Sequence, residues 1–260
     1  MIIIMTSSKD VKAVMSEFFG TFFIVFVSCW TFTSLAYKQI NWLGLALANG
    51  LTVAACAWAA ISASGAHFNP VVTLIRASSK SISIPMAVTY ICVQLLASII
   101  ASLFVILITP FEFQQDDASI IGFPKANPLM SDFQIFIVEF LGSCLYVFAY
   151  YAFVVDKRAP KNVFGYALGA AIMASTVAFG PFSGACINPV RIFGPHLVTG
   201  KYSRAWSFWL ADIFGGIFAG FYYEFFLMKD SLLIDNEEEE DSNKNMKNSE
   251  NINQALSLRF

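Results

Sequence analysis

Six long stretches of apolar residues, joined by short polar connections, run along most of the chain. Each is close to the ~20 residues that a helix needs to cross a lipid bilayer. They cover approximately residues 12–35, 43–63, 85–108, 133–155, 163–180 and 205–228. Two further stretches, at about 66–79 and 185–197, are moderately apolar but too short to cross. The pattern predicts an all-α membrane protein with six transmembrane helices and two shorter segments.

Polar residues set the limits of this membrane domain. After Lys229 the chain becomes rich in Asn and Glu and includes the acidic run EEEED at 237–241. Such a composition cannot bury enough apolar surface to fold, so we expect a disordered tail. The chain therefore divides into an N-terminal segment at 1–8, a membrane domain at 9–230 and an acidic tail at 231–260.

The membrane domain contains an internal repeat. The matches join residues 16–26 (SEFFGTFFIVF) to 138–148 (VEFLGSCLYVF), 44–57 (GLALANGLTVAACA) to 165–178 (GYALGAAIMASTVA), and 92–98 (CVQLLAS) to 210–216 (LADIFGG), at offsets of 122, 121 and 118. The two halves, about 9–108 and 131–230, then have three spans each. Because three is odd, the second half is turned over in the membrane, which makes an inverted repeat.

The two short segments carry the same motif. Residues 64–71 (SGAHFNPV) and 183–190 (SGACINPV) agree at six of eight positions. Asn is a good helix N-cap and Pro is favoured at the first helical position, so each Asn-Pro pair predicts a helix start. A half-helix of about ten residues is roughly 15 Å long, and two that enter from opposite faces cover the ~30 Å hydrocarbon core. We therefore expect two re-entrant half-helices whose N-termini meet at mid-membrane.

Backbone groups before each half-helix require a special environment. The extended stretches SGAHF and SGACI leave carbonyl groups unpaired. At membrane depth such backbone is tolerated only where it is buried in protein or lines a water-filled cavity. The repeat therefore predicts an aqueous path through the domain.

Composition and charge agree with a membrane protein and exclude several functions. Hydrophobic residues make up 57% of the chain and charged residues 13%, against about 25% charged in soluble domains. The net charge of −2 gives no indication of nucleic-acid binding. With the N-terminus inside, the inner loops hold seven Lys and Arg residues and the outer loops four. The positive-inside rule then predicts that both termini are cytoplasmic.

The residue types needed for catalysis are missing from the pattern. His67 and His196 are the two histidines, and the sequence has no Ser-His-Asp set, metal-ligand cluster or phosphate-binding glycine loop. We therefore predict no enzyme activity, no metal site and no cofactor. An ion channel needs rings of charge or carbonyl groups, which the sequence does not indicate.

The repeated motifs resemble those of the aquaporin (major intrinsic protein) family, over about residues 9–230. That family carries two Asn-Pro-Ala boxes, and here Val stands in the place of Ala. The boxes are Asn69, Pro70, Val71 and Asn188, Pro189, Val190. The resemblance implies that both Asn side chains donate hydrogen bonds to a passing molecule, while the half-helix dipoles exclude cations and protons. It also implies a homotetramer with one pore per subunit, in a plasma membrane or an internal, vacuolar-type membrane.

The resemblance also implies a selectivity filter. By the spacing of the family, its members are Asn49, Thr176, Ala185 and Arg191. In water-selective members of the family the filter is a narrow ring of Phe, His, Cys and Arg. In glycerol channels of the family two of the filter residues are usually aromatic. The smaller side chains here predict a wider, more polar filter that passes water and small neutral solutes such as glycerol and urea.

Other residues favour a strictly water-selective channel. Ile192 stands where glycerol facilitators have Asp after the filter Arg, and Phe208 and Trp209 match the Phe-Trp pair typical of water channels. The third alternative is a structural or adhesive membrane protein with a vestigial pore. Retention of both Asn residues and of Arg191 argues against it.

We expect functional or supporting roles at five further positions. In the family, residues that match Glu17 and Glu139 accept hydrogen bonds from the re-entrant loops, and the residue that matches His67 turns its carbonyl to the pore. Cys186, beside the filter, is either a site for thiol reagents such as mercury or part of the packing. Asp212 stands where relatives generally have Pro, and it has either a local hydrogen-bonding role or a role in the pore or an interface.

Overall fold

The computed structural model describes residues 7–110, 121–160 and 162–228. The expected tail at 231–260 lies outside these residues, as does most of the segment at 1–8. The chain divides into two compact units, Met1–Gly220 and Phe221–Phe260. All regular structure in the described residues is helical, and six helices are long and apolar enough to cross a membrane. The predicted fold class is confirmed.

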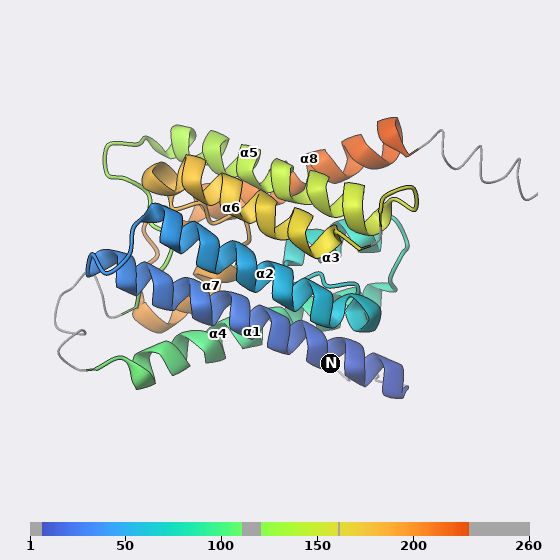
Figure 1. The fold of residues 1–260 in the computed structure, drawn as a ribbon, viewed down its shortest axis with the longest axis horizontal. Coiled ribbons are helices and arrows are strands. Elements are labelled where there is room, and N and C mark those ends of the chain that lie inside the picture. Colours follow the sequence, from blue (N-terminus) through green and yellow to red (C-terminus); the bar gives the residue numbers. More distant parts are fainter. Residues whose placement is uncertain (1–6, 111–120, 161, 229–260) are drawn as a thin grey trace, which may run out of the picture. The chain divides into compact units, whose positions relative to one another are not determined.

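The order of the helices follows the predicted repeat (Figure 1). The long helices are α1 (Ser8–Ala36), α2 (Trp42–Ser64), α4 (Ile84–Ile108), α5 (Asp132–Tyr150) with its π-helical continuation η2 (Tyr151–Val155), α6 (Phe164–Ser183), and α8 (Ala205–Tyr222) followed by η3 (Tyr223–Leu227). The short helices are α3 (Pro70–Ser78) and α7 (Val190–Thr199). Each short helix follows the second long helix of its half, as the repeat requires.

Helix ends are set by local sequence in the same way in both halves. α1 begins with a capping box between Ser7 and Asp10, and α5 begins with one between Ser131 and Gln134. α2 and α6 both end at a glycine in the left-handed region, with φ of 84° at Gly65 and 93° at Gly184. Only glycine adopts that conformation at little cost, so the chain turns sharply there into each re-entrant loop.

α6 is longer than the apolar pattern indicates and contains a proline. The pattern predicts a fifth span at about 163–180, whereas α6 continues through Pro181 to Ser183. A proline inside a helix costs one backbone hydrogen bond and usually kinks or ends it. Here the left-handed Gly184, rather than the proline, ends the helix.

Helices of the two halves pack against each other through small residues. Within the first unit α1 packs against α2 and α4, α5 packs against α6, and α2 of the first half packs against α6 of the second. At the crossing of α2 and α6, a Cβ added to Gly50 would lie 2.6 Å from the carbonyl O of Gly169, and one added to Gly169 would lie 2.6 Å from that of Gly50. Close approach through such pairs is typical of helices in lipid, where the backbones meet.

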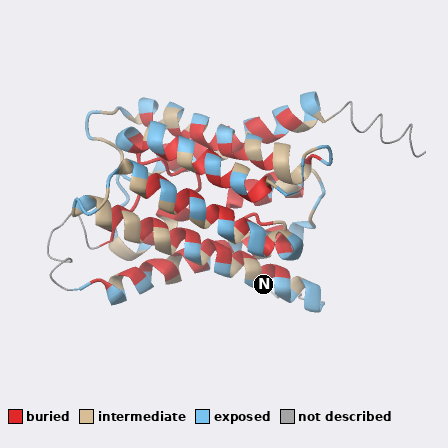
Figure 2. Cartoon of the chain, in the orientation of Figure 1, coloured by how far each residue is buried: buried red, intermediate tan, exposed pale blue. Residues whose placement is uncertain are grey.

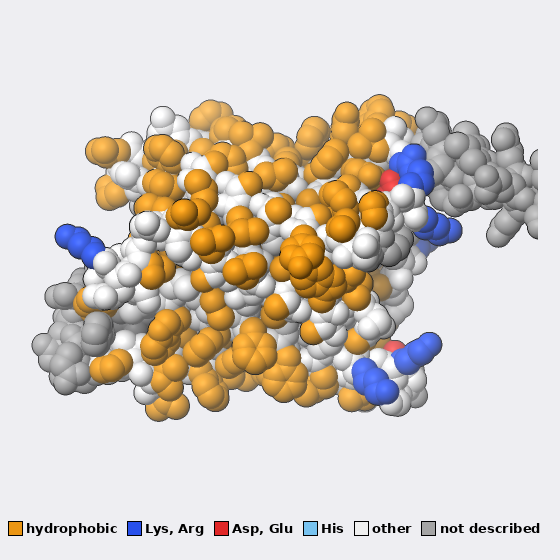
Figure 3. Space-filling view, viewed as in Figure 1, with side chains coloured by type: hydrophobic (Ala, Val, Ile, Leu, Met, Phe, Trp, Pro, Cys, Tyr) orange, Lys and Arg blue, Asp and Glu red, His pale blue; other side chains and the backbone are white. Residues whose placement is uncertain are grey.

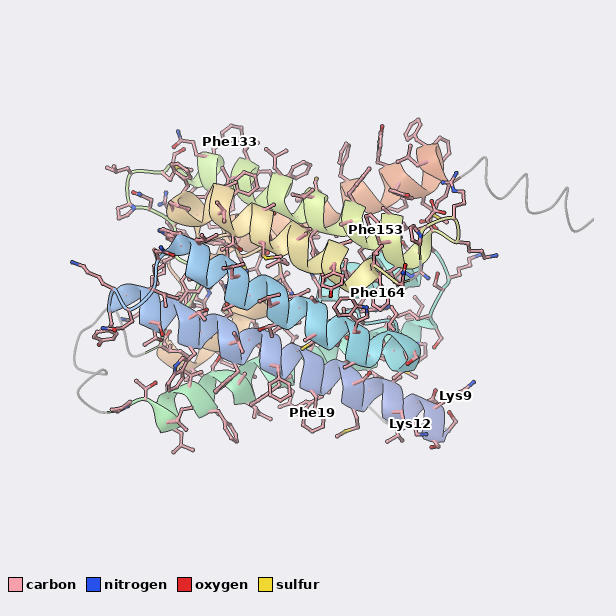
Figure 4. The ribbon with its side chains drawn as sticks, in the orientation of Figure 1. Lys9, Lys12, Phe19, Phe133, Phe153 and Phe164 are labelled. Carbon is pink, nitrogen blue, oxygen red and sulfur yellow. The ribbon has the colours of Figure 1, made fainter. Side chains whose placement is uncertain are left out.

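The surface of the helices is apolar. Buried residues lie on the helix faces that point toward one another (Figure 2), and hydrophobic side chains cover the middle of the visible face, with Lys and Arg toward its ends (Figure 3). Lys9 and Lys12 lie at the start of α1, and Phe19 lies further along the helix (Figure 4), half exposed at 50%. In water such a surface would aggregate, whereas in a bilayer it contacts lipid.

Candidate functional site

The two Asn-Pro motifs start the two half-helices. Asn69 caps α3, and its Oδ1 accepts a hydrogen bond from the backbone N–H of Val71 at 2.9 Å. Asn188 Oδ1 accepts the equivalent bond from Val190 at 3.3 Å. α7 begins at Val190, one residue later than expected, because Pro189 with φ −53° and ψ −30° occupies the cap position. The side chain of Asn188 nevertheless makes the capping contact that the motif predicts.

The side-chain amide groups of the two asparagines form hydrogen bonds between the two halves of the repeat. Asn188 Nδ2 donates to the carbonyl O of Phe68 at 2.8 Å, and Asn69 Nδ2 donates to that of Ile187 at 3.4 Å. Each acceptor is the residue directly before the other asparagine. The two half-helix N-termini are therefore tied back to back, and each amide keeps a second N–H for another partner.

Val71 and Val190 contribute to packing. Both are fully buried. Val190 belongs to a hydrophobic cluster that includes Val25 and Ala101, and Val71 fills the space beside Gly216, where a Cβ would overlap its Cγ1. Neither side chain lines the small cavity at the centre of the site. Val in the place of Ala therefore acts on the packing of the half-helices against the long helices, and neither side chain is part of the cavity wall.

The loops before the half-helices have unusual backbone. Ala66 and Phe68 have φ of 51° and 49°, and Ala185 and Ile187 have φ of 50° and 61°. Non-glycine residues in the left-handed region cost of order 1–3 kcal/mol each and persist only where the surroundings hold them. The strain falls at equivalent positions of both halves, so it belongs to the repeated motif.

Glu17 holds the first loop. Its carboxylate accepts hydrogen bonds from Ser64 Oγ at 2.6 Å, the N–H groups of His67 and Phe68 at 2.9 and 2.7 Å, and Gln94 Nε2 at 2.8 Å. Four donors around a fully buried carboxylate compensate for its loss of hydration. They also fix the loop in its left-handed conformation.

Glu139 holds the second loop with fewer partners. Its oxygens accept from the N–H groups of Cys186 and Ile187 at 3.0 and 2.9 Å. The position equivalent to Gln94 in this half is Asp212, which is fully buried. Neither carboxyl oxygen of Asp212 accepts a well-formed hydrogen bond from the described residues. The thiol of Cys186 is nevertheless a hydrogen-bonding neighbour of this carboxyl group, so a local hydrogen-bonding role and a role in the pore or an interface both stay open for Asp212.

His67 and Cys186 both lie inside the packing. His67 is 2% exposed, and its Nδ1 lies 3.1 Å from Thr73 Oγ1. Cys186 is fully buried, and its thiol donates to the carbonyl O of Asn188 at 3.2 Å beside Phe208. Of the two alternatives considered for Cys186, this geometry favours packing.

Arg191 is held by its own loop and by the first helix. Its Nη1 donates to the carbonyl O atoms of Ala185 and Cys186, and its Nε and Nη2 lie 3.2 and 2.9 Å from Ser28 Oγ. A guanidinium has five N–H donors, so these four contacts leave one free for the lumen. Sequence reasoning missed Ser28, because one hydroxyl within an apolar span carries no motif.

A small cavity lies where the asparagine and arginine meet. It has a volume of about 10 Å³ and is lined by Ile24, Asn49, Val53, Tyr146, Ile172, Asn188 and Arg191. A cavity in which the centre of a water-sized sphere can reach about 10–15 Å³ holds one water molecule. The structure thus brings three of the predicted residues, Asn49, Asn188 and Arg191, to one cavity, whereas Asn69, Thr176 and Ala185 lie outside its lining.

Two polar atoms near the filter are left without partners. Asn49 Nδ2 and Thr176 Oγ1 are buried and make no hydrogen bond with the described residues. A buried donor or acceptor without a partner costs about 1–3 kcal/mol. Water or another polar molecule beside them would remove that cost.

A family model described as "Major intrinsic protein" matches residues 4–223. The chain is 32% identical to Aquaporin NIP1-1 of Zea mays over 215 residues, which is 82% of this chain and 74% of that protein. It is 30% identical to Nodulin-26 of Glycine max, over 84% of this chain and 79% of that protein. It is 31% identical to Aquaporin A of Dictyostelium discoideum, over 85% and 82%. The family model spans all the residues of the site.

The fold also matches a solved structure. The X-ray structure of the aquaglyceroporin from Plasmodium falciparum superimposes with a TM-score of 0.74 and 20% identity, covering 84% of this chain and 97% of that one. At that identity the match supports the fold alone.

Proposed function

The chain belongs to the major intrinsic protein family, and we propose that it is a passive transmembrane channel for water and small neutral polar solutes such as glycerol and urea. Proteins of this family are channels rather than enzymes. The observation that carries the proposal is the set of unused polar atoms at the centre of the molecule. Asn49 and Asn188 line the cavity, and Asn49 Nδ2 and the second N–H of Asn188 are each available to a passing hydroxyl or amide.

The proposed channel excludes protons and ions by means of the two half-helix N-termini and Arg191. The N-termini of α3 and α7 meet at the two asparagines and place partial positive charge at mid-membrane. The guanidinium of Arg191 adds a full charge beside the same cavity. A cation entering there would lose its hydration shell against two positive barriers.

A strictly water-selective channel is the second candidate. The observation that favours it is the cavity of about 10 Å³, which has room for a single water molecule. On that reading the small side chains at Thr176 and Ala185 do not widen the path enough for a larger solute.

Stopped-flow light scattering on proteoliposomes distinguishes the channel for water and small solutes from the strictly water-selective channel. An osmotic step with an impermeant solute measures water flow, and inward gradients of glycerol and urea measure solute entry. Fast shrinkage followed by re-swelling is the expected result. Fast shrinkage without re-swelling supports the water-selective candidate, and shrinkage no faster than that of empty liposomes rules out an open pore.

We also propose a homotetramer with one pore per subunit, cytoplasmic termini, and a plasma or vacuolar-type membrane as its location. The resemblance to the family supports the assembly, and the bias of Lys and Arg toward the inner loops supports the orientation.

A further inference from the structure

We infer that Tyr146, on α5, sets the upper size limit of the solute that this channel admits. The inference rests on the proposed function, because a size limit has meaning only in an open pore. It places the narrowest point beside the crossed asparagines rather than at the small side chains of the filter.

Tyr146 is the bulkiest of the hydrophobic side chains that line the central cavity. Among the described residues that line it, Tyr146 is the one aromatic side chain; Ile24, Val53 and Ile172 supply aliphatic walls. The tyrosine is 4% exposed, so its ring is enclosed by neighbouring helices. An aromatic ring turns about two side-chain bonds only, and within close packing it yields less readily than a flexible chain.

The internal repeat fixes the depth of this wall. Ile24 and Tyr146 are equivalent positions of the two halves, 122 residues apart. At 1.5 Å per residue, Ile24 lies about 24 Å from the start of α1 and Tyr146 about 21 Å from the start of α5. In an inverted repeat, equivalent residues that share a cavity lie near the axis at mid-membrane. The two side chains thus face the same short segment of the path as Asn188.

The available volume makes this segment selective. The cavity, at about 10 Å³, is close to the size of one water molecule, so a larger solute passes only where the walls give way, and the least yielding wall sets the limit. Of the four aliphatic and aromatic walls, the ring of Tyr146 is the bulkiest, so shortening it gives the largest gain in width. Ile24, the equivalent residue of the first half, has no ring, so shortening it gives a smaller gain in width.

The test is the ratio of glycerol permeability to water permeability in proteoliposomes. Tyr146→Leu should raise that ratio at least about tenfold, the lower end of the effect of one methylene in a tight pocket. Ile24→Ala widens the facing wall at the same depth and should raise it in the same direction. This second variant keeps the test decisive if Tyr146→Leu fails to fold. Tyr146→Phe keeps the ring and should retain the wild-type ratio.

Tyr166→Leu is the matched control, because it makes the same exchange on α6 at a side chain that is 63% exposed. Both permeabilities should be unchanged. A wild-type ratio in Tyr146→Leu and Ile24→Ala, with water flow intact, overturns the inference. A raised ratio in Tyr146→Phe assigns the limit to the hydroxyl and overturns the steric explanation. Absence of water flow in the wild-type protein overturns the proposed function, and so is distinguished from these results.

Discussion

At the scale of single residues, Arg191 combines a full positive charge with an almost complete set of hydrogen bonds. Three of its contacts fix the guanidinium between the second loop and Ser28 of α1. A charge held in this way cannot move aside when a cation approaches. In the proposed channel, its fixed position would set both the barrier to cations and the one N–H that remains for the lumen.

Arg191→Val should raise the permeability to protons or small cations, because it removes the fixed charge at the cavity. The measurement is the cation leak of voltage-clamped cells expressing the variant. Arg191→Lys keeps a charge and should stay near the wild-type leak, although its ammonium cannot make the same forked contacts. A leak in Arg191→Val equal to that of the wild type would falsify the role of Arg191 as the electrostatic barrier.

Glu17→Ala should lower stability by at least about 4 kcal/mol, because four buried donors lose their acceptor at about 1–3 kcal/mol each. Thermal unfolding in detergent measures the change. Glu17→Gln keeps one acceptor oxygen and should lose less. An unchanged midpoint in Glu17→Ala would mean that water replaces the carboxylate without cost.

Single residues were predictable where chemistry repeats along the chain. The capping role of Asn69 follows from its place before a proline, and the support by Glu17 and Glu139 was implied by the resemblance to the family. Ser28 and Tyr146 appear once each within apolar spans. Hydropathy does not reveal which face of a helix points to the lumen, so their roles required the packed structure.

At the scale of elements, the contact between α4 and α7 depends on a missing side chain. A Cβ on Gly194 would overlap the backbone carbonyl O of Ser98, and the N–H of Gly194 donates to Ser98 Oγ at 2.9 Å. The half-helix that carries Arg191 is therefore seated directly on the backbone of a long helix. The two helices are close-packed here, so the contact has no space for an additional side-chain atom.

Gly194→Ala should lower both thermal stability and water permeability, because α7 must move away from α4 and takes Arg191 with it. Light scattering and unfolding in detergent measure the two effects. Gly44→Ala is the control, since its added Cβ meets nothing closer than 3.4 Å. At that helical position alanine should leave stability unchanged or raise it by up to about 1 kcal/mol. Equal behaviour of the two variants would contradict the close-packing argument.

The long helices were predictable to within a few residues, because hydropathy and length suffice for a membrane span. The largest difference is at the start of α1, which begins at Ser8 because its capping box lies in polar residues before the apolar stretch at about 12–35. α6 ends at Ser183 rather than near 180, and α7 begins at Val190 rather than at Pro189. These last two ends adjoin the second re-entrant loop, whose tertiary contacts decide the backbone and are not part of local propensity.

At the scale of the whole molecule, the repeat and the distribution of charge together predict orientation. An epitope placed before Lys9 should be inaccessible to antibody in intact cells and become accessible after permeabilisation, because the inner loops carry the excess of Lys and Arg. An epitope in the connection between α1 and α2, around Lys38, should be accessible in both. The reverse pattern would place the N-terminus outside and invert the direction of the pore.

The crossed asparagine contacts also have a consequence for biosynthesis. The acceptor of Asn69 lies 118 residues further along the chain, at Ile187. A ribosome adding about 5–20 residues per second needs about 6–24 s to reach it. During that interval the half-helix of the first half has no partner, so the contact between the two asparagine loops forms only after the chain has been made as far as Ile187.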